Sequence, residues 1–336
     1  MKKTVLLLVV LLSTQVVGQS GGGTVFPFLT AYHSGLGVAL GQGAVAYNAR
    51  TSELAFENPL LLNDSLMGQV AMGGGLLAEG IHLIQGSYTF ESKRGQRFIT
   101  GFKTVQYGAF ESTDIWGNSL GTFYASDYSI QLGAQQDLGK HWKLGVNAKV
   151  VNGTYETYQS WAVASDVYLG REVSKGRFFM VHAQNIGTQL TAFHNVREPM
   201  PFDLALSLNG KLEHAPFHWA LVVDQLHKPN LAYNDPNLVS IDPITGEETV
   251  EAQSLLNLTL RHISGSLAME LTNRVHLFSG FSFRKQYETA LPQRRTSGGF
   301  SFGVGIYFKR LQIHYGNDMR SVSGRMNTLS LTLPLN

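Results

Sequence analysis

The sequence has no cysteine, little charge and no long apolar run, and each absence excludes a class of protein. Without cysteine there is no disulfide framework, no thiolate metal site and no lipid-modified N-terminal cysteine. Charged residues make up 15% of the chain, against about 25% in an average domain. The formal net charge of +2 gives no reason to expect a nucleic-acid partner. Beyond the N-terminus, no stretch approaches the ~18 consecutive apolar residues of a membrane helix.

Residues 1–18 have the pattern of a secretory signal peptide. Lys2 and Lys3 form the basic start, an apolar run follows from Val5 to Leu12, and Gly18 ends a small-residue cleavage site. We therefore predict an exported protein. Residues 19–64 form an N-terminal segment, and residues 65–336 form the main domain.

From about Leu66 onward the dominant pattern has period two, which is typical of strands with one apolar and one polar face. Tyr128, Ile130 and Leu132 alternate with polar or small residues, and the same alternation resumes after a short turn near Gly139. It recurs up to Leu335 at the end of the chain. The pattern predicts long antiparallel strands joined as hairpins.

Two all-β architectures fit this pattern. A soluble sandwich buries its apolar faces between two sheets, whereas an outer-membrane barrel turns them to lipid. Connection length favours the barrel, because short links alternate with longer ones, as tight periplasmic turns alternate with outer loops. The short links are 93–96, 138–141, 171–176, 212–216, 271–273 and residue 309, and the longer ones are 111–122, 187–200, 227–253, 286–297 and 319–324. We predict a transmembrane outer-membrane β-barrel of about 14 antiparallel strands, with both of its ends on the short-turn side.

The stretch 34–62 departs from the strand pattern. Gly41 and Gly43 permit close backbone packing, residues 51–56 favour a short helix, and Asn58-Pro59 ends it. A barrel of ~14 strands leaves a passage unless something fills it. We predict that residues 19–64 form a plug in the barrel, with Gly41, Gly43, Asn58 and Pro59 as its motif.

The sequence contains no catalytic motif, and we assign no catalytic, cofactor or metal residue. Eleven histidines are scattered, without a metalloprotease pair or a nucleophile elbow. A Ser–His pair meeting on the outer face is not excluded by spacing, but no residue pattern supports it. The connection 227–253 is acidic, yet it lacks the regular spacing of a calcium loop. We interpret it as a solvated outer loop that could dock a partner; its candidate contact residues are Tyr233, Asp235, Asp242, Glu247 and Glu248.

One run also resembles a known family. Residues 21–62 have a Gly-Gly start before Phe26-Pro27-Phe28-Leu29, the core Ala39-Leu40-Gly41, and Asn58-Pro59 followed by leucines. This run resembles the N-terminus of the PorQ family, outer-membrane proteins of the type IX secretion system of Bacteroidetes. More distantly, it is similar to PorV and to FadL-type fatty-acid transporters.

The resemblance implies a FadL-like, 14-stranded barrel with an N-terminal plug and no enzymatic activity. It further implies membership of a cell-surface attachment complex, in which the chain anchors a PorZ-like protein that binds lipopolysaccharide, near the PorU sortase and the PorV shuttle. The expected location is the outer membrane, with loops at the cell surface. The alternative is a FadL-like transporter of hydrophobic small molecules.

Overall fold

The computed structural model describes residues 23–47, 51–77, 80–174, 176–232, 239–241, 248–250, 254–289, 297–320 and 324–335. The predicted signal peptide, residues 1–18, lies outside these ranges. Within them, no helix is long and apolar enough to cross a membrane.

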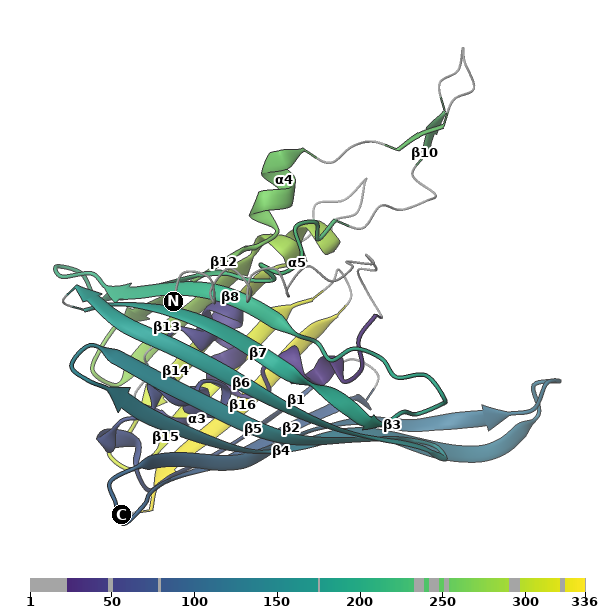
Figure 1. Cartoon of the computed structure of the whole chain (residues 1–336), viewed down its shortest axis with the longest axis horizontal. Coiled ribbons are helices and arrows are strands. Elements are labelled where there is room, and N and C mark those ends of the chain that lie inside the picture. Colours follow the sequence, from purple (N-terminus) through teal and green to yellow (C-terminus); the bar gives the residue numbers. More distant parts are fainter. Residues whose placement is uncertain are drawn as a thin grey trace, which may run out of the picture.

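Fourteen antiparallel strands close into one barrel, as the sequence predicted (Figure 1). Around the wall, the strands follow chain order, and β1 pairs with β16 to close it. The wall strands are β1 (Gln69–Leu76), β2 (His82–Glu91), β3 (Arg97–Thr113), β4 (Ser119–Leu138), β5 (Trp142–Tyr155), β6 (Tyr158–Ser174), β7 (Arg177–Thr191), β8 (Asp203–Lys211), β9 (Phe217–Val223), β12 (Ile263–Glu270), β13 (Val275–Ser282), β14 (Phe300–Tyr307), β15 (Gln312–Met319) and β16 (Arg325–Pro334).

The register of the closing pair places the start and end of the barrel together. Gln69 at the start of β1 lies opposite Pro334 at the end of β16. The even strand number brings both to the end of the barrel where the short turns lie, as predicted. We call this the short-turn end and the opposite end the long-loop end.

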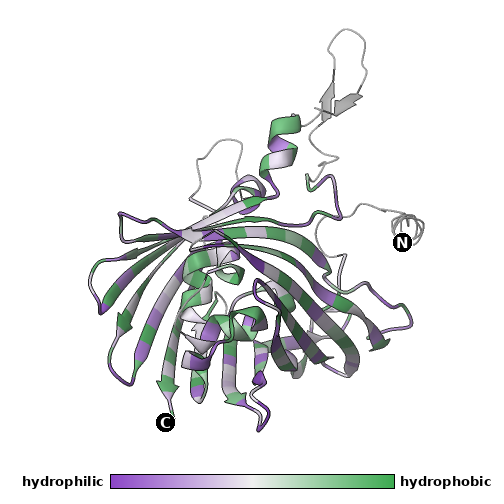
Figure 2. Ribbon diagram, turned by 60° about the vertical axis from the view of Figure 1, so that its left-hand side comes forward, coloured by the Kyte–Doolittle hydropathy of each residue, from purple (hydrophilic) through white to green (hydrophobic). Residues whose placement is uncertain are grey.

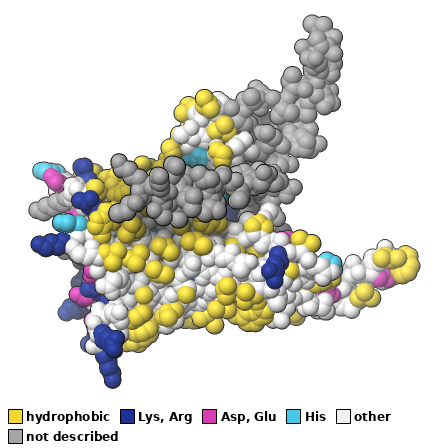
Figure 3. All heavy atoms as spheres, in the orientation of Figure 1, with side chains coloured by type: hydrophobic (Ala, Val, Ile, Leu, Met, Phe, Trp, Pro, Cys, Tyr) yellow, Lys and Arg dark blue, Asp and Glu magenta, His cyan; other side chains and the backbone are white. Residues whose placement is uncertain are grey.

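Polar side chains face the interior and apolar side chains face outward. On β4, Ile130 and Leu132 are exposed, whereas Ser129 and Gln131, which alternate with them, are buried. Figure 2 shows the alternation along the strands, and in Figure 3 hydrophobic side chains cover much of the wall in view, with charged groups gathered at its left-hand end. A sandwich would bury the apolar face instead, so this polarity decides between the two predicted architectures.

One expected long loop is mostly strand. The sequence predicted a connection over 111–122, but β3 and β4 continue into it and leave a turn of residues 114–118. A bulge after Gln106 shifts the register, and beyond it the stacked rings of Phe110 and Phe123 lie 5.4 Å apart between centroids. Cross-strand aromatic pairs stabilise such a ribbon, which alternation alone does not reveal. The hairpin extends well past its neighbours at the long-loop end (Figure 1).

The connection between β9 and β12 also contains structure. Two short strands, β10 (Val239–Ile241) and β11 (Glu248–Val250), pair with each other, and α4 (Leu255–Leu260) leads back to the wall. A further helix, α5 (Phe283–Glu288), follows β13. These elements stand at the long-loop end (Figure 1).

Most of the described N-terminal residues lie inside the barrel (Figure 1), while Asp64 and Ser65 are exposed beside the short-turn end of β3. The N-terminal residues form short helical elements: η1 (Pro27–Thr30), α2 (Gly35–Leu40), η2 (Gly41–Val45), α3 (Ser52–Glu57), η3 (Pro59–Leu61) and η4 (Asp64–Leu66). The helix predicted over 51–56 corresponds to α3, displaced by one residue. The proposed boundary between residues 64 and 65 stays a prediction.

Candidate functional site in the barrel lumen

The N-terminal segment crosses the lumen and touches most of the wall. α2 packs on β13 to β16, η2 on β9, β12 and β13, α3 on β1 to β3, and η3 on β4 to β6. Leu36, Leu40, Leu54 and Phe56 are completely buried, and they form one apolar cluster with wall residues such as Phe278. The segment therefore has its own small core inside a polar-lined barrel.

Local hydrogen bonds explain why the segment folds in short helices. Ser34 accepts from the amide of Gly37 at 3.1 Å and caps α2, and Thr51 accepts from Glu53 at 3.4 Å to cap α3. Side-chain caps satisfy amides that have no partner in the first helical turn. Gly41 then ends α2 with φ of 57°, a conformation that favours glycine, so the chain turns directly into η2.

All four predicted motif residues lie in this segment. A Cβ at Gly43 would come within 2.2 Å of the Ser266 hydroxyl oxygen on β12, so only glycine fits there. The side-chain amide nitrogen of Asn58 donates to the carbonyl of Val45 at 2.7 Å. The side-chain oxygen of Asn58 accepts from the backbone amide of Leu60 at 3.0 Å. Asn58 thus ties η2 to η3, while Pro59 begins η3.

Glycines in the wall meet the segment from the other side. A Cβ at Gly303 would lie 2.3 Å from that of Ala39, and one at Gly316 would lie 2.1 Å from the carbonyl oxygen of Gly35. Close contact between α2 and the wall therefore requires small residues on both surfaces. This explains part of the glycine content that the composition showed.

One carboxylate of the segment is bound entirely by the wall. Glu53 lies 2.6 Å from Nδ1 of His314, and it accepts from the hydroxyls of Ser330 at 2.6 Å and Thr332 at 3.1 Å. Burial by itself raises the pKa of Glu53, but the imidazole and the two hydroxyls outweigh it and lower that pKa below its ordinary value. Glu53 therefore stays ionised and joins α3 to β15 and β16.

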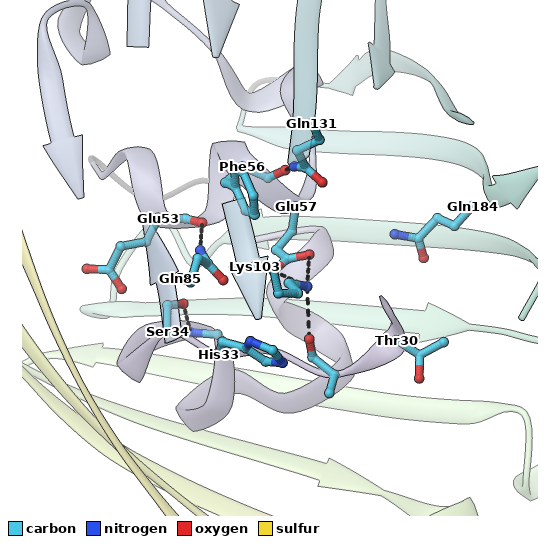
Figure 4. A network of polar contacts seen from close by, with 12 residues as sticks. Thr30, His33, Ser34, Glu53, Phe56, Glu57, Gln85, Lys103, Gln131 and Gln184 are labelled. Atoms are coloured by element: carbon cyan, nitrogen blue, oxygen red, sulfur yellow. Dashed lines mark hydrogen bonds and ion pairs between the residues drawn. The ribbon is translucent and has the colours of Figure 1, made fainter. Parts of the chain in front are cut away.

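A buried ion pair lies at the C-terminal end of α3. The ammonium of Lys103 on β3 lies 2.8 Å from the carboxylate of Glu57 and donates to the carbonyl of Ala31 at 2.9 Å (Figure 4). The Tyr168 hydroxyl donates to the Glu57 carbonyl at 2.6 Å, and the Gln131 amide donates to the Phe56 carbonyl. Together these bonds hold the exit of α3 against three wall strands.

The sequence did not identify Glu53, Glu57, Lys103 or His314. The sequence did offer one signal. Lys103 and His314 each lie on the polar side of a strand, and in a barrel whose apolar sides face outward, the polar sides face the lumen. Their partners were not evident, because Glu53 and His314 are 261 residues apart in the chain.

Most of the predicted partner loop, 227–253, lies outside the described residues. Tyr233, Asp235, Asp242 and Glu247 lie outside the described residues, and Glu248 is described only as the first residue of β11. Across the described part of the chain, no group of three or more His, Cys, Asp or Glu side chains could hold a metal ion.

Comparison with known proteins identifies structures that share the fold of this chain. No protein-family model matches the chain, and no curated protein matches its sequence. The toluene transporter TodX of Pseudomonas putida superposes with a TM-score of 0.51 at 11% identity, covering 90% of this chain and 97% of TodX. The chain has the same barrel fold. The toluene transporter TbuX of Ralstonia pickettii gives a TM-score of 0.50 at 9% identity, covering 91% of this chain and 98% of TbuX.

A FadL homologue of Pseudomonas aeruginosa is also similar, with a TM-score of 0.48 and 10% identity over 94% of this chain and all of its own length. At such identities the likeness to the two toluene transporters concerns architecture only. The fold is that of outer-membrane proteins, which supports the predicted location in the outer membrane.

Proposed function

We propose that the chain is an outer-membrane transporter of hydrophobic small molecules, the alternative function that the sequence left open. The observation that carries the proposal is a closed 14-stranded barrel that superposes along nearly its whole length on two toluene transporters. The long-loop end faces the cell exterior, and the short-turn end faces the periplasm, as in other bacterial barrels.

In this proposal the N-terminal segment is a plug that keeps the barrel from acting as an open pore. Its support is the contact of α2, η2, α3 and η3 with the wall around most of its circumference. The Glu53–His314 and Glu57–Lys103 pairs hold the plug in place. A transporter of hydrophobic molecules needs such a barrier, because an open barrel would also pass water and ions.

Uptake into vesicles tests the transport function. The full chain, reconstituted into phospholipid vesicles, should bind and pass radiolabelled toluene or a labelled long-chain fatty acid in a saturable manner. Heat-unfolded protein in the same vesicles is the control. Equal, non-saturable retention of both probes by the two samples would rule out the transporter.

Single-channel conductance tests the plug separately. Deletion of residues 34–62 should raise the conductance of the reconstituted barrel. Because the deletion removes part of the core, a variant that weakens both anchors, Glu53→Gln with Lys103→Met, should give brief openings in an otherwise complete chain. If neither protein conducts more than the wild type, the segment is not a plug.

Anchoring in the type IX attachment complex stays a prediction of the family resemblance. Its partners would be a PorZ-like surface protein, PorU- and PorV-like members, and lipopolysaccharide. A detergent pull-down with mass spectrometry tests it: an anchor should recover a large surface protein, and deletion of residues 230–253 should abolish that recovery. Recovery of the barrel alone from its native membrane would count against an anchoring role.

A further inference from the structure

The outer surface of the wall has a groove at the closing seam of the barrel. It has a volume of about 480 Å³ and lies over β1, β2, β15 and β16. That volume falls within the range of about 300–1,000 Å³ typical of ligand sites. The apolar side chains that line it are Leu76, Ile84, Leu329 and the ring of Tyr315. Leu76 and Leu329 are more than half exposed, so the groove opens outward.

The groove exists because β1 contains three successive glycines. A Cβ at Gly73 would lie 2.9 Å from the Cβ of Ser330 on the lumenal side, where Ser34 of the N-terminal segment also approaches. A Cβ at Gly75 would lie 2.3 Å from the Asn327 carbonyl oxygen, and one at Gly74 would lie 2.7 Å from that of Leu83. Because residues 73–75 have no side chain, the hollow beside Leu76 is a fixed feature of the backbone.

One end of the groove is polar. The side-chain oxygen of Asn327 accepts from the Tyr315 hydroxyl and from the amide of Asn317, each at 2.7 Å. His82, at the start of β2, is exposed beside them. Leu76 lies opposite both Asn327 and His82 at the long-loop end, whereas Ile84 and Leu329 lie opposite Gly74, two residues closer to the middle of the wall.

The outward face around the groove indicates what occupies it. Met72 on β1, Leu331 on β16 and Tyr88 on β2 continue the exposed apolar surface beyond the groove. On an outer-membrane barrel that surface contacts acyl chains. A permanent apolar hollow in such a surface cannot hold water without losing hydrogen bonds, and the nearest apolar filler is lipid.

We propose that this groove is a binding site for one membrane lipid, with the polar head beside Asn327 and His82 at the level of Leu76 and an acyl chain running from there along Ile84 and Leu329. The site rests on the outer-membrane location and not on the transport function. It is separated from the lumen by the wall itself.

Native mass spectrometry of the full chain tests the site. The protein is reconstituted into vesicles of phosphatidylethanolamine and phosphatidylglycerol, then extracted and washed in mild detergent. The wild type should retain one phospholipid per barrel. Leu329→Trp should fill the groove and weaken retention roughly tenfold, which corresponds to about 1.4 kcal/mol in affinity.

Leu331→Trp is the matched control, because Leu331 is exposed on the same face of β16 but does not line the groove. It should retain lipid like the wild type. Ile84→Trp, which enters the groove from the opposite side, should weaken lipid retention as Leu329→Trp does.

Heat-modifiable migration on gels confirms that each variant is folded. Equal retention by Leu329→Trp and wild type overturns the site, as does displacement of the retained lipid by free toluene. Labelled-toluene uptake by Leu329→Trp should match that of the wild type, which separates this site from the transport function.

Discussion

Individual glycines decide how closely the N-terminal segment approaches the wall. At Gly43 the neighbouring atom is a wall side chain, the Ser266 hydroxyl, so both surfaces can be altered. Gly265 next to Ser266 is different, since a Cβ there would meet nothing closer than 3.7 Å. Comparing an added methyl group at these two glycines therefore measures how much close packing at Gly43 contributes to stability.

Gly43→Ala should destabilise the protein by about 1–3 kcal/mol, because an added methyl group in a filled interior forces its neighbours to shift. Ser266→Gly in the same chain should recover most of that loss. Urea unfolding in lipid vesicles, followed by tryptophan fluorescence, measures both, with Gly265→Ala as the control that should change little. Failure of Ser266→Gly to compensate would mean that the cost arises elsewhere.

Glu53 is the carboxylate that joins the segment to the last two strands. Glu53→Gln should cost about 1.5–3 kcal/mol of unfolding free energy, because His314, Ser330 and Thr332 lose a buried, charged acceptor. Glu270→Gln is a suitable comparison, since Glu270 pairs with His218 at 2.8 Å but is partly exposed, and such pairs contribute about 0–1 kcal/mol. Similar losses in the two variants would contradict the anchoring role of Glu53.

The lowered pKa of Glu53 also predicts how stability depends on pH. A carboxyl group with a depressed folded-state pKa contributes its full stability above the unfolded value of about 4.3, and loses it as pH falls through the folded value. The wild type should therefore lose more stability than Glu53→Gln between about pH 5 and pH 3. Parallel pH profiles in urea unfolding would show that Glu53 is not responsible for the acid sensitivity.

Among the elements, the β3–β4 hairpin is the most unusual, because it continues as a free ribbon beyond the wall. Its turn is organised by Asp114, whose carboxylate accepts from the amides of Trp116 and Asn118 and from the Asn118 side chain, each at 2.9 Å. These hydrogen bonds, led by the Asn118 side chain, lower the pKa of Asp114 below its usual range. Ile115 and Trp116 at the tip are almost fully exposed.

Asp114→Ala should loosen the tip without affecting the barrel. Amide hydrogen exchange, read by mass spectrometry, should become faster at residues 114–119 and stay unchanged in the wall strands, because the turn amides lose their acceptor. Glu111→Ala in the same hairpin removes a carboxylate that lies outside the turn, and it should leave exchange at the tip unchanged. A drop in the unfolding midpoint of the whole barrel would contradict this local role.

At the scale of the whole molecule, the barrel is a polar interior inside an apolar wall. Ile130 on β4 is exposed in the middle of the wall, and it pairs with Phe102 and Val150 on either side. Leu120 on the same strand is exposed as well, but it lies in the hairpin beyond the wall. Two exposed side chains of one strand thus have different surroundings, lipid for Ile130 and water for Leu120.

Ile130→Arg should destabilise the barrel in vesicles by about 2–4 kcal/mol, as a cation placed near the middle of the bilayer does, whereas Leu120→Arg should cost about 0–1 kcal/mol. Urea titration of the two variants in the same vesicles makes the comparison. Equal costs would mean that the hairpin is not outside the membrane or that the wall does not face lipid.

The sequence by itself determined the barrel. Alternation along residues such as Tyr128 to Gln135, and links of alternating length, were enough, because side chains in a strand point to opposite faces and every second connection lies at the same end. It also placed a short helix before Pro59 and glycines where close packing was required. These are local properties of the chain.

Only the tertiary structure decided how the lumen is held. Glu53 meets His314 across 261 residues, and Lys103 meets Glu57 because β3 happens to face the end of α3. The length of the β3–β4 ribbon is of the same kind. Such features depend on which strands the closed barrel brings face to face, and no local pattern in the chain specifies that.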